Sequence, residues 1–443
     1  MKYIGLLAGK LALFFGNLLN RGSSFPGLVA RKISPGILQK IKYPDKIIMV
    51  TGTNGKTSTA NLLADIIEKS GKKVIHNTRG ANMMNGLVTA IIEGTGLGMK
   101  MKADVLLLEI DESTIPKFFK LVTPTHLAVT NFFRDQLDRH GEIDTLIKKI
   151  MGAVDKEVCL VLNGNDPLVH SLGEGLSENP KIYYGVEETE YSYFDETEVR
   201  ESKWCPNCNS VLKYKYYHYS QIGNYECDCG FKTPELKYTA TDVDLPNKSF
   251  KVNGKEYKSN YDNMYFVFNT LGAIALAEEI GIDYESIRDA VCEFKIGDGR
   301  MEEFNVGEYR TFLNLVKNPA GLNQSVNHIL NQGDESFSVF FAVNNNWADG
   351  IDTSWLWDVA FEKFRDSGLD KFICSGMRAY DLAVRLKYAG IDEAKIIVLP
   401  EIPEALDFLK SRTDSKPYIL SSYTALQDLR KALNSLEENK EKK

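Results

Sequence analysis

The residues best suited to chemistry form one short polar stretch, Gly52-Thr53-Asn54-Gly55-Lys56-Thr57-Ser58. Glycines let backbone N–H groups approach a phosphate closely, and a helix that starts in such a stretch adds partial positive charge at its N-terminus. In phosphate-binding loops the lysine neutralises the β- and γ-phosphates, and the hydroxyl residue after it binds Mg²⁺. The stretch therefore predicts an ATP site in which Lys56 contacts phosphate and Thr57 ligates Mg²⁺.

The elements that must position this stretch are visible on both sides of it. Residues 46–50 form a short apolar run, typical of a buried strand, and residues 59–69 are apolar at helical spacing up to Gly71. The general eight-residue pattern requires glycine where this chain has Val50, so the loop is a shorter form. A chance glycine-rich turn is the alternative, and the strand–loop–helix order argues against it.

Further apolar runs indicate strands at 73–75, 103–112, 126–131 and 158–163, with helical segments between them. Strands that alternate with helices predict a doubly wound, mostly parallel α/β sheet. The second of these runs carries carboxylates at its C-terminal end, among them Glu109. Because such sheets bind ligands beyond the carboxyl ends of their strands, we expect Glu109 close to the phosphate loop.

Residues 200–232 break the α/β pattern with two cysteine pairs, Cys205 with Cys208 and Cys227 with Cys229. Paired cysteines near tight turns predict a four-thiolate Zn²⁺ site on a small ribbon. The second pair has one intervening residue instead of two, which leaves His218 as an alternative ligand. Disulfides are the other alternative, and nothing in the sequence suggests an oxidising compartment. The remaining cysteines, Cys159, Cys292 and Cys374, are expected to be small core residues.

The charge of the chain is uneven. The formal net charge is −7, which argues against a nucleic-acid partner, but residues 1–44 carry seven basic side chains and no acidic one. Residues 3–20 are strongly apolar, although Lys10 interrupts them and no small-residue cleavage site follows. We expect an amphipathic helix rather than a signal peptide or a spanning helix. It either docks on the protein or holds a cytoplasmic enzyme near anionic lipid.

Helical residues 263–294 follow, and strands are expected at 311–316, 337–343, 371–375, 395–399 and 417–420. The chain therefore divides into a basic amphipathic segment (1–44), an ATP-binding domain (45–302) with the ribbon inserted at about 200–235, and a Rossmann-like α/β domain (303–443).

Several motifs resemble one known family. The short loop Gly-Thr-Asn-Gly-Lys-Thr, the stretch from Asn131 to Gly141, Asn269 on a helix and the sequence at Gly299-Arg300 are similar to those of Mur ligases. The cysteine pairs, residues 314–321, residues 348–355 and residues 376–381 are similar to the MurT group of that family. MurT proteins are the ligase subunits of lipid II isoglutaminyl synthases and form heterodimers with a GatD-type glutaminase subunit.

The resemblance implies an ATP-dependent carbon–nitrogen ligase that acts in peptidoglycan synthesis. Such an enzyme activates the α-carboxylate of D-glutamate in the lipid II stem peptide as an acyl phosphate, which ammonia from the partner then attacks. By motif match, Thr57 and Glu109 would ligate Mg²⁺, Asn269 would contact adenine and Arg300 would reach the ribose or phosphates. Asn82 would lie near the acceptor, and the zinc site would be structural.

Two departures separate this chain from the amino-acid-adding Mur ligases. The histidine that helps those enzymes bind a second Mg²⁺ is Gln136 here, and their carbamylated lysine falls on Ile150. An amino-acid-adding ligase, of the Mur or folylpolyglutamate kind, is one competing hypothesis. A non-catalytic nucleotide-binding scaffold is another, and the presence of both Lys56 and Glu109 argues against it.

Asp349 is the residue that the resemblance assigns to the chemistry of the partner. No cysteine–histidine pair in this chain looks like a glutaminase nucleophile and base, so both would come from the partner. A catalytic histidine usually needs a carboxylate that fixes its tautomer, and Asp349 would supply it across the subunit interface. Asp352 is the second candidate. The structural alternatives are a turn residue before Gly350 for Asp349 and a helix N-cap for Asp352.

Overall fold

The computed structural model of the chain describes residues 2–18, 22–77, 81–135, 142–194, 200–295, 302–412 and 415–441. It divides into two compact units. Unit 1 comprises Met1–Phe133 and Glu142–Phe294, and unit 2 comprises Arg134–Gly141 and Lys295–Lys443. The three-part division expected from the sequence stays a prediction, although the N-terminal helices here belong to unit 1.

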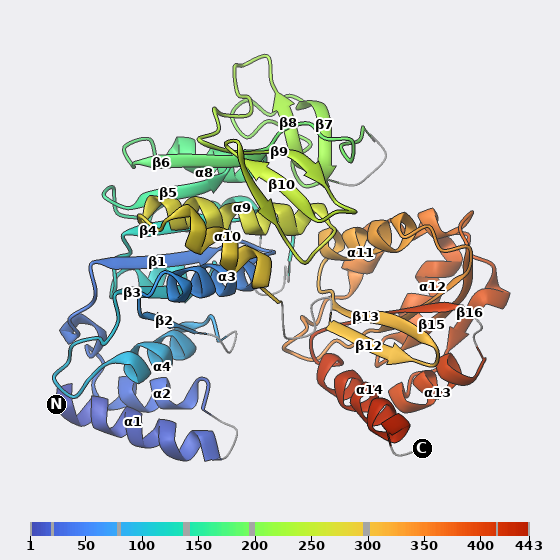
Figure 1. Cartoon of the computed structure of the whole chain (residues 1–443), viewed down its shortest axis with the longest axis horizontal. Helices are drawn as coiled ribbons and strands as arrows, with labels where there is room; N and C mark the ends of the chain where they lie inside the picture. The colour runs from blue at the N-terminus through green and yellow to red at the C-terminus, as the bar shows by residue number, and fades with distance from the viewer. Residues whose placement is uncertain are drawn as a thin grey trace. The chain divides into compact units, whose positions relative to one another are not determined.

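Unit 1 is built on a nine-stranded sheet (Figure 1). Its strands are β1 (Lys46–Thr51), β2 (Val74–His76), β3 (Val105–Glu109), β4 (His126–Val129), β5 (Cys159–Asn163), β6 (Lys181–Val186), β9 (Tyr238–Asp244), β10 (Ser249–Val252) and β11 (Lys255–Lys258). Their order across the sheet is β11-β10-β9-β6-β5-β4-β1-β3-β2. The seven strands from β2 to β9 pair in parallel, and β10 and β11 add an antiparallel edge. The doubly wound, mostly parallel sheet that the sequence predicts is therefore confirmed.

Helices cover both faces of this sheet. One face packs against α4 (Met84–Gly94), α5 (Ile115–Phe118), α7 (Ile143–Met151) and α8 (Pro167–Gly175) in a single apolar cluster. The other face carries α3 (Lys56–Lys69), α9 (Met264–Glu279) and α10 (Tyr284–Glu293), and α3 packs along α9. The helical segment expected at 263–294 is thus two helices, which separate at Gly281, where φ is +78°.

Two further helices open the chain, α1 (Lys2–Leu18) and α2 (Phe25–Ile33). Helix α1 packs on α2, and both contact α4 on the edge of unit 1 shown in blue in Figure 1. The expected N-terminal helix is therefore present. Among the described residues, no helix has both the length and the apolar character needed to cross a bilayer.

A small ribbon interrupts the sheet's connectivity between β6 and β9, which are neighbours in the sheet. It contains β7 (Lys213–Tyr219) and β8 (Ile222–Glu226), which pair in antiparallel fashion. An aromatic cluster ties the ribbon to α8: the Phe231 ring stacks on His170 with centroids 4.6 Å apart, and the Tyr225 hydroxyl lies 3.0 Å from His170 Nδ1.

Unit 2 contains a six-stranded sheet in the order β12-β13-β17-β14-β15-β16. Its strands are β12 (Glu302–Val306), β13 (Tyr309–Leu315), β14 (Phe337–Ala342), β15 (Leu369–Ser375), β16 (Ile396–Val398) and β17 (Lys416–Ser421). Apart from the antiparallel β12–β13 pair, the strands run in parallel. Among the residues of this unit that the structure describes, four α-helices accompany the strands: α11 (Pro319–Asn331), α12 (Ala379–Tyr388), α13 (Ile402–Arg412) and α14 (Leu426–Glu441). The second α/β domain is therefore confirmed, with strand β12 as an addition to the expected set.

The expectation for the single cysteines is correct only in part. Cys374 is buried near the end of β15, and Cys159 is half-buried at the start of β5. Cys292 is exposed near the end of α10, so its assignment to the core was wrong. The apolar residues around it in sequence face inward on the helix while the thiol faces solvent.

Candidate nucleotide site and partner site

The phosphate loop lies where the winding of the unit 1 sheet reverses. The chain leaves β1 to form β2 and β3 on one side of it, then crosses to form β4 on the other side. In open parallel sheets such a switch point leaves a crevice beyond the strand ends, where ligands bind. Residues 52–55 follow β1 at this position and lead directly into α3, so the strand–loop–helix prediction is confirmed.

The loop requires glycine at two positions. Gly52 and Gly55 have φ angles of +123° and +87°, a backbone conformation that other residues rarely adopt. Gly55 also packs directly against Asn269 of α9, since a Cβ at position 55 would lie 2.1 Å from Asn269 Oδ1. The predicted adenine contact thus lies beside the loop, and the buried Asn269 Nδ2 has no hydrogen-bond partner.

Hydrogen bonds from the segment after β4 hold the phosphate loop in place. Asn131 Oδ1 accepts a hydrogen bond of 2.8 Å from the backbone N–H of Asn54, and its amide donates to the Asn54 carbonyl at 3.0 Å. The Thr130 hydroxyl donates to the same carbonyl at 2.7 Å, and the Thr53 hydroxyl accepts from the Phe133 N–H at 2.9 Å. Side chains from two neighbouring strand ends therefore fix the loop before any ligand binds.

Lys56 begins α3, and its side chain is buried against a carboxylate that sequence reasoning did not single out. Its ammonium lies 3.2 Å from Glu112 Oε1 and also donates to the backbone carbonyls of Gly52 and Thr53. Lys56 is 8% exposed and Glu112 is 5% exposed. Glu112 ends the acidic run after β3, and that run was the signal that could have identified it.

Glu109, the last residue of β3, is 2% exposed. Its Oε1 accepts a hydrogen bond of 2.9 Å from the Asn82 amide, while its Oε2 is buried without a partner. An unpaired buried carboxylate oxygen is costly, and a bound cation would remove that cost. The structure therefore brings Asn82 to Glu109, and this oxygen suits a metal ligand. Thr57 and Ser58 lie in the first turn of α3, half-buried and buried respectively.

Other predicted positions are less informative. Arg300, Gln136 and the end of the Asn131–Gly141 stretch, His140 and Gly141, fall outside the described residues. Ile150, the position of the carbamylated lysine in amino-acid-adding ligases, is fully buried in the core, whereas Lys148 and Lys149 are exposed.

A second group of polar residues lies at the carboxyl ends of the unit 2 strands. Asp349 follows β14 and is 8% exposed. Its Oδ1 accepts from the Thr424 N–H at 2.7 Å, and its Oδ2 accepts from the Thr424 hydroxyl at 2.6 Å and the Asn346 N–H at 3.0 Å. The carboxylate thus joins the loops after β14 and β17, and Thr424 is a contact that sequence reasoning missed. Asp352 accepts from the Ser354 N–H at 2.8 Å, but the N-cap residue of the short helix Ser354–Asp358 is Thr353, so the contact of Asp352 belongs to the turn before that helix.

Exposed apolar side chains surround Asp349 on the loops and helix starts that follow β14, β15 and β17. Their exposures range from 56% to 69%, which is unusual for aromatic and aliphatic residues of this size. The group consists of Trp347, Ile351, Met377, Tyr380 and Tyr423. An exposed apolar surface around a nearly buried carboxylate is typical of a protein-binding site.

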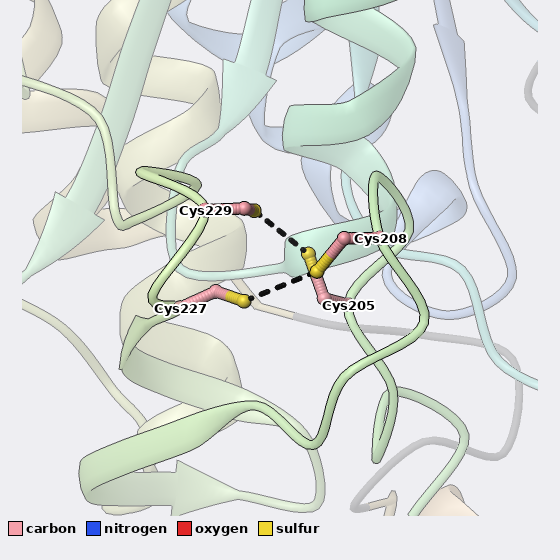
Figure 2. A group of neighbouring side chains, drawn as sticks. All are labelled: Cys205, Cys208, Cys227 and Cys229. Carbon is pink, nitrogen blue, oxygen red and sulfur yellow. Dashed lines mark hydrogen bonds between the residues drawn. The ribbon is translucent and has the colours of Figure 1, made fainter.

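The four ribbon cysteines converge from two facing loops (Figure 2). All four sulfurs lie within 4.8 Å of one another, with Cys205 and Cys229 3.6 Å apart and Cys208 and Cys227 3.5 Å apart. Tetrahedral zinc with Zn–S bonds of about 2.3 Å separates its sulfurs by about 3.8 Å, so the cluster fits such an ion. All four are free thiols in this structure, which favours a metal site over the disulfide alternative.

His218 lies outside this cluster, so the structure does not support it as a substitute ligand. Its Nε2 lies 3.1 Å from the Val186 carbonyl and its Nδ1 lies 3.3 Å from the Ser192 hydroxyl. Burial lowers the pKa of His218 to about 4.

Comparisons with known proteins identify one family, the Mur ligases. Residues 50–277 match the family model of the Mur ligase middle domain, and residues 315–426 match that of the MurT ligase C-terminal region. The MurT subunit of the glutamine-hydrolysing lipid II isoglutaminyl synthase from Staphylococcus aureus (strain COL) is 36% identical over 98% of this chain and 97% of its own length. The corresponding subunit from Streptococcus pneumoniae is 34% identical over the same shares.

Solved structures show the same fold. A pseudomurein peptide ligase type C from Methanothermus fervidus superposes with a TM-score of 0.73 at 24% identity, over 90% of this chain and 80% of that one. MurF from Thermotoga maritima, solved in complex with ADP, has a TM-score of 0.59 at 14% identity, over 94% of this chain and 84% of that one. These likenesses establish the architecture and leave the assignment of individual residues to the geometry described above.

Proposed function

Because this chain belongs to the Mur ligase family, and within it to the MurT ligase subunits, we propose that it amidates the D-glutamate α-carboxylate of the lipid II stem peptide. In the first step the carboxylate attacks the γ-phosphorus of ATP, which forms an acyl phosphate and releases ADP. In the second step ammonia attacks the acyl carbon, phosphate leaves with its bonding electrons and the nitrogen loses a proton. The product is D-isoglutamine.

The observation that carries this proposal is the phosphate loop at the switch point of the sheet, with Lys56 at the start of α3 and Glu109 at the end of β3. Phosphoryl transfer demands positioning and charge stabilisation more than covalent chemistry by the protein. The loop N–H groups and Lys56 would stabilise the phosphates, and the braces from Thr130 and Asn131 hold the loop in place. Asn269 would contact the adenine, and Arg300 the ribose or phosphates.

Magnesium is the cofactor that the donor set fits. Glu109 Oε2 is a buried acceptor without a partner, and Thr57 supplies a hydroxyl from the adjacent helix start. Hydroxyl and carboxylate oxygens are the ligands that Mg²⁺ prefers. When bound with ATP, the ion would neutralise charge on the phosphates. Asn82 donates to Glu109 and would orient its carboxylate for that role, which differs from the acceptor contact expected from the sequence.

A glutaminase subunit of the GatD kind would supply the ammonia and form a heterodimer with this chain. The surface around Asp349 supports this part of the proposal, since exposed apolar residues surround a fixed carboxylate there. Asp349 would orient a histidine of the partner and stabilise its protonated form. The two hydrogen bonds from Thr424 keep the carboxylate in one orientation, which such a role requires.

Zinc would be a structural cofactor, held by the four ribbon cysteines. The ribbon joins unit 1 through hydrogen bonds such as the one of 3.0 Å from the Asn165 amide to the Gly223 carbonyl. The four thiols lie on the ribbon inserted between β6 and β9, so we assign the zinc a role in folding and not in catalysis.

The test of the proposed function is Lys56→Ala. We expect this variant to lose both ATP hydrolysis and ammonia-driven amidation of lipid II, because the phosphates lose their cation. Lys69→Ala is the matched control, since it removes an exposed lysine from the other end of the same helix. Circular dichroism and a melting temperature would establish that both variants fold.

Normal ATP turnover in a folded Lys56→Ala protein would contradict the proposal. Turnover that depends on an amino acid instead of ammonia would favour the amino-acid-adding alternative. A wild-type chain without any substrate-dependent ATP hydrolysis, even with its partner, would favour the scaffold alternative.

A further inference from the structure

Helix α1 presents its large apolar side chains to solvent. Seven of them are between 49% and 70% exposed, and they recur at intervals of three and four residues along one side of the helix. We refer to them as the outer stripe: Tyr3, Ile4, Leu7, Leu11, Phe14, Phe15 and Leu18. A surface helix of a globular protein normally turns such a stripe toward the core, so α1 has the reverse orientation.

The inward side of α1 is built for close packing on the protein. Gly5, Leu6, Gly9 and Gly16 are its buried residues. A Cβ at Gly5 would lie 2.6 Å from Ser34 Cβ, and one at Gly9 would lie 3.0 Å from Ala30 Cβ. The helix therefore cannot rotate to bury the outer stripe without driving bulky side chains into α2. The outward orientation is fixed by the packing of the folded unit.

The charge of this region complements an anionic surface. Residues 1–44 contain seven basic side chains and no acidic one, whereas the whole chain has a net charge of −7. Lys10 lies beside the outer stripe, where its ammonium donates to the Glu93 carbonyl at 3.2 Å, and Lys32 and Lys40 are exposed at the ends of the elements that follow. Basic residues near an anionic leaflet each contribute about 1 kcal/mol to membrane binding.

A second copy of the chain is the less suitable occupant. A stable dimer needs about 20–30 residues from each partner, whereas the outer stripe is one helix wide and is extended mainly by Phe25 and Ile33 of α2. Like charges around the stripe would also repel each other across a two-fold interface.

We propose that the outer stripe of α1 inserts into the surface of an anionic lipid bilayer, with the helix lying in the plane of the membrane. A helix in this position buries its apolar side about 5–10 Å into the boundary between headgroups and acyl chains. Helix α1 packs along α2 and α4 and has 17 described residues, fewer than the about 20 of a typical span, so we place it on the membrane surface and not across the bilayer. The inference rests on α1 and on the basic residues of the segment 1–44, and it does not require the proposed ligase activity.

The test is flotation of the full chain with vesicles. We expect wild-type protein to float with vesicles of phosphatidylglycerol and phosphatidylcholine, and to float far less with phosphatidylcholine alone or at high salt. Leu11→Ser/Phe14→Ser should lower the partition coefficient about tenfold or more, because two large side chains lose their burial in lipid. These serines add no charge, so they isolate the apolar contribution.

Leu97→Ser/Val211→Ser is the matched control, since both side chains are exposed and neither belongs to the outer stripe. It should float like wild type, and the melting temperatures of both double variants should stay close to that of wild type because no core residue changes. Equal flotation of the stripe variant and wild type would overturn the proposal. The proposal would also be overturned if the wild-type chain does not bind vesicles but self-associates while the stripe variant stays monomeric. That result would assign the outer stripe to the interface with a second copy.

Discussion

The ammonium group of Lys56 forms an ion pair with a carboxylate of its own chain. Its ammonium contacts the carboxylate of Glu112 and two carbonyls of its own loop, and both side chains are nearly buried. A phosphate group that binds Lys56 would meet this carboxylate at the same ammonium. Glu112 therefore competes with the ligand for the same cation, and its negative charge also repels the ATP phosphates.

We expect Glu112→Gln to bind ATP more tightly than wild type, by about tenfold, because the amide removes the competing charge while it keeps the shape of the side chain. Calorimetric titration with a non-hydrolysable ATP analogue measures this directly. Asp111→Asn is the matched control, since it removes a neighbouring half-buried carboxylate that accepts a hydrogen bond from the Ser113 N–H.

The control should bind the analogue with wild-type affinity. An unchanged or lower affinity of Glu112→Gln would contradict the prediction and would indicate that the carboxylate keeps Lys56 in a binding-competent position.

The identity of the loop residues could be predicted from the sequence because each has a chemical role that depends on its type and spacing. Val50, Lys56 and Glu109 all lie where the strand–loop–helix pattern placed them. The Lys56–Glu112 pair could not be predicted in this way, since it joins residues 56 positions apart whose meeting depends on the register of β1 against β3. The Asp349–Thr424 contact likewise joins two separate strand ends.

At the scale of elements, the ribbon depends on its cysteines. We expect elemental analysis of the purified chain to find one Zn²⁺ per chain, and Cys208→Ser to lower that content and to make the ribbon sensitive to proteolysis. Cys292→Ser, which alters an exposed thiol outside the cluster, is the matched control and should retain the metal. A wild-type chain without zinc, or with these thiols in disulfides, would refute the prediction. ATP turnover of Cys208→Ser should survive at temperatures where unit 1 stays folded.

His218 of the ribbon makes a pH-dependent contribution to the free energy of unfolding. Burial lowers the pKa of His218 to about 4, against about 6.5 in an unfolded chain. Between these values the unfolded chain binds a proton that the folded chain does not, so this contribution is complete above pH 6.5 and is lost as the pH falls toward 4. The loss amounts to about 3 kcal/mol in the limit.

We expect His218→Gln to lose less stability than wild type over that pH range, since glutamine keeps a hydrogen-bond donor but does not titrate. Denaturant unfolding at several pH values with excess zinc measures the difference. Parallel pH profiles for the two proteins would show that another group governs the acid sensitivity.

The elements themselves were predictable to different degrees. Strongly apolar runs such as 103–112 and 337–343 correspond to β3 and β14, because strands buried on both faces need continuous apolar sequence. The edge strand β11 and its antiparallel neighbour β10 were not predicted, since both are short and alternate apolar with charged residues such as Lys251 and Glu256. The orientation of α1 was also beyond prediction, because the sequence shows an apolar side without showing which side the protein covers.

At the scale of the whole molecule, the chain carries two chemically distinct sites on two separate units. The phosphate loop, Glu109 and Asn269, which we assign to the nucleotide, belong to unit 1, and Asp349 belongs to unit 2. We therefore expect Asp349→Asn, assayed with the glutaminase subunit, to lose glutamine-driven amidation while it keeps amidation with added ammonia. The amide also weakens the contacts to Thr424, so a somewhat lower melting temperature should accompany the substitution.

Asp352→Asn is the matched control, because it removes a nearby exposed carboxylate that accepts a hydrogen bond from the Ser354 N–H. It should keep both activities. Full glutamine-dependent activity in Asp349→Asn would show that the partner completes its own catalytic set, and a selective loss in Asp352→Asn would transfer the role to that residue.

The position of the ribbon between β6 and β9 has a consequence for the order in which the chain folds. These two strands are neighbours in the sheet, yet about fifty residues separate Val186 from Tyr238. Closing so long a loop costs more chain entropy than closing a short one, and non-local pairing slows folding. If zinc first gathers the four thiols, the intervening chain becomes a compact block and the remaining closure is short. Zinc binding would then speed the pairing of β6 with β9. We expect the refolding rate to be lower in the presence of a chelator, even where the final native state still forms.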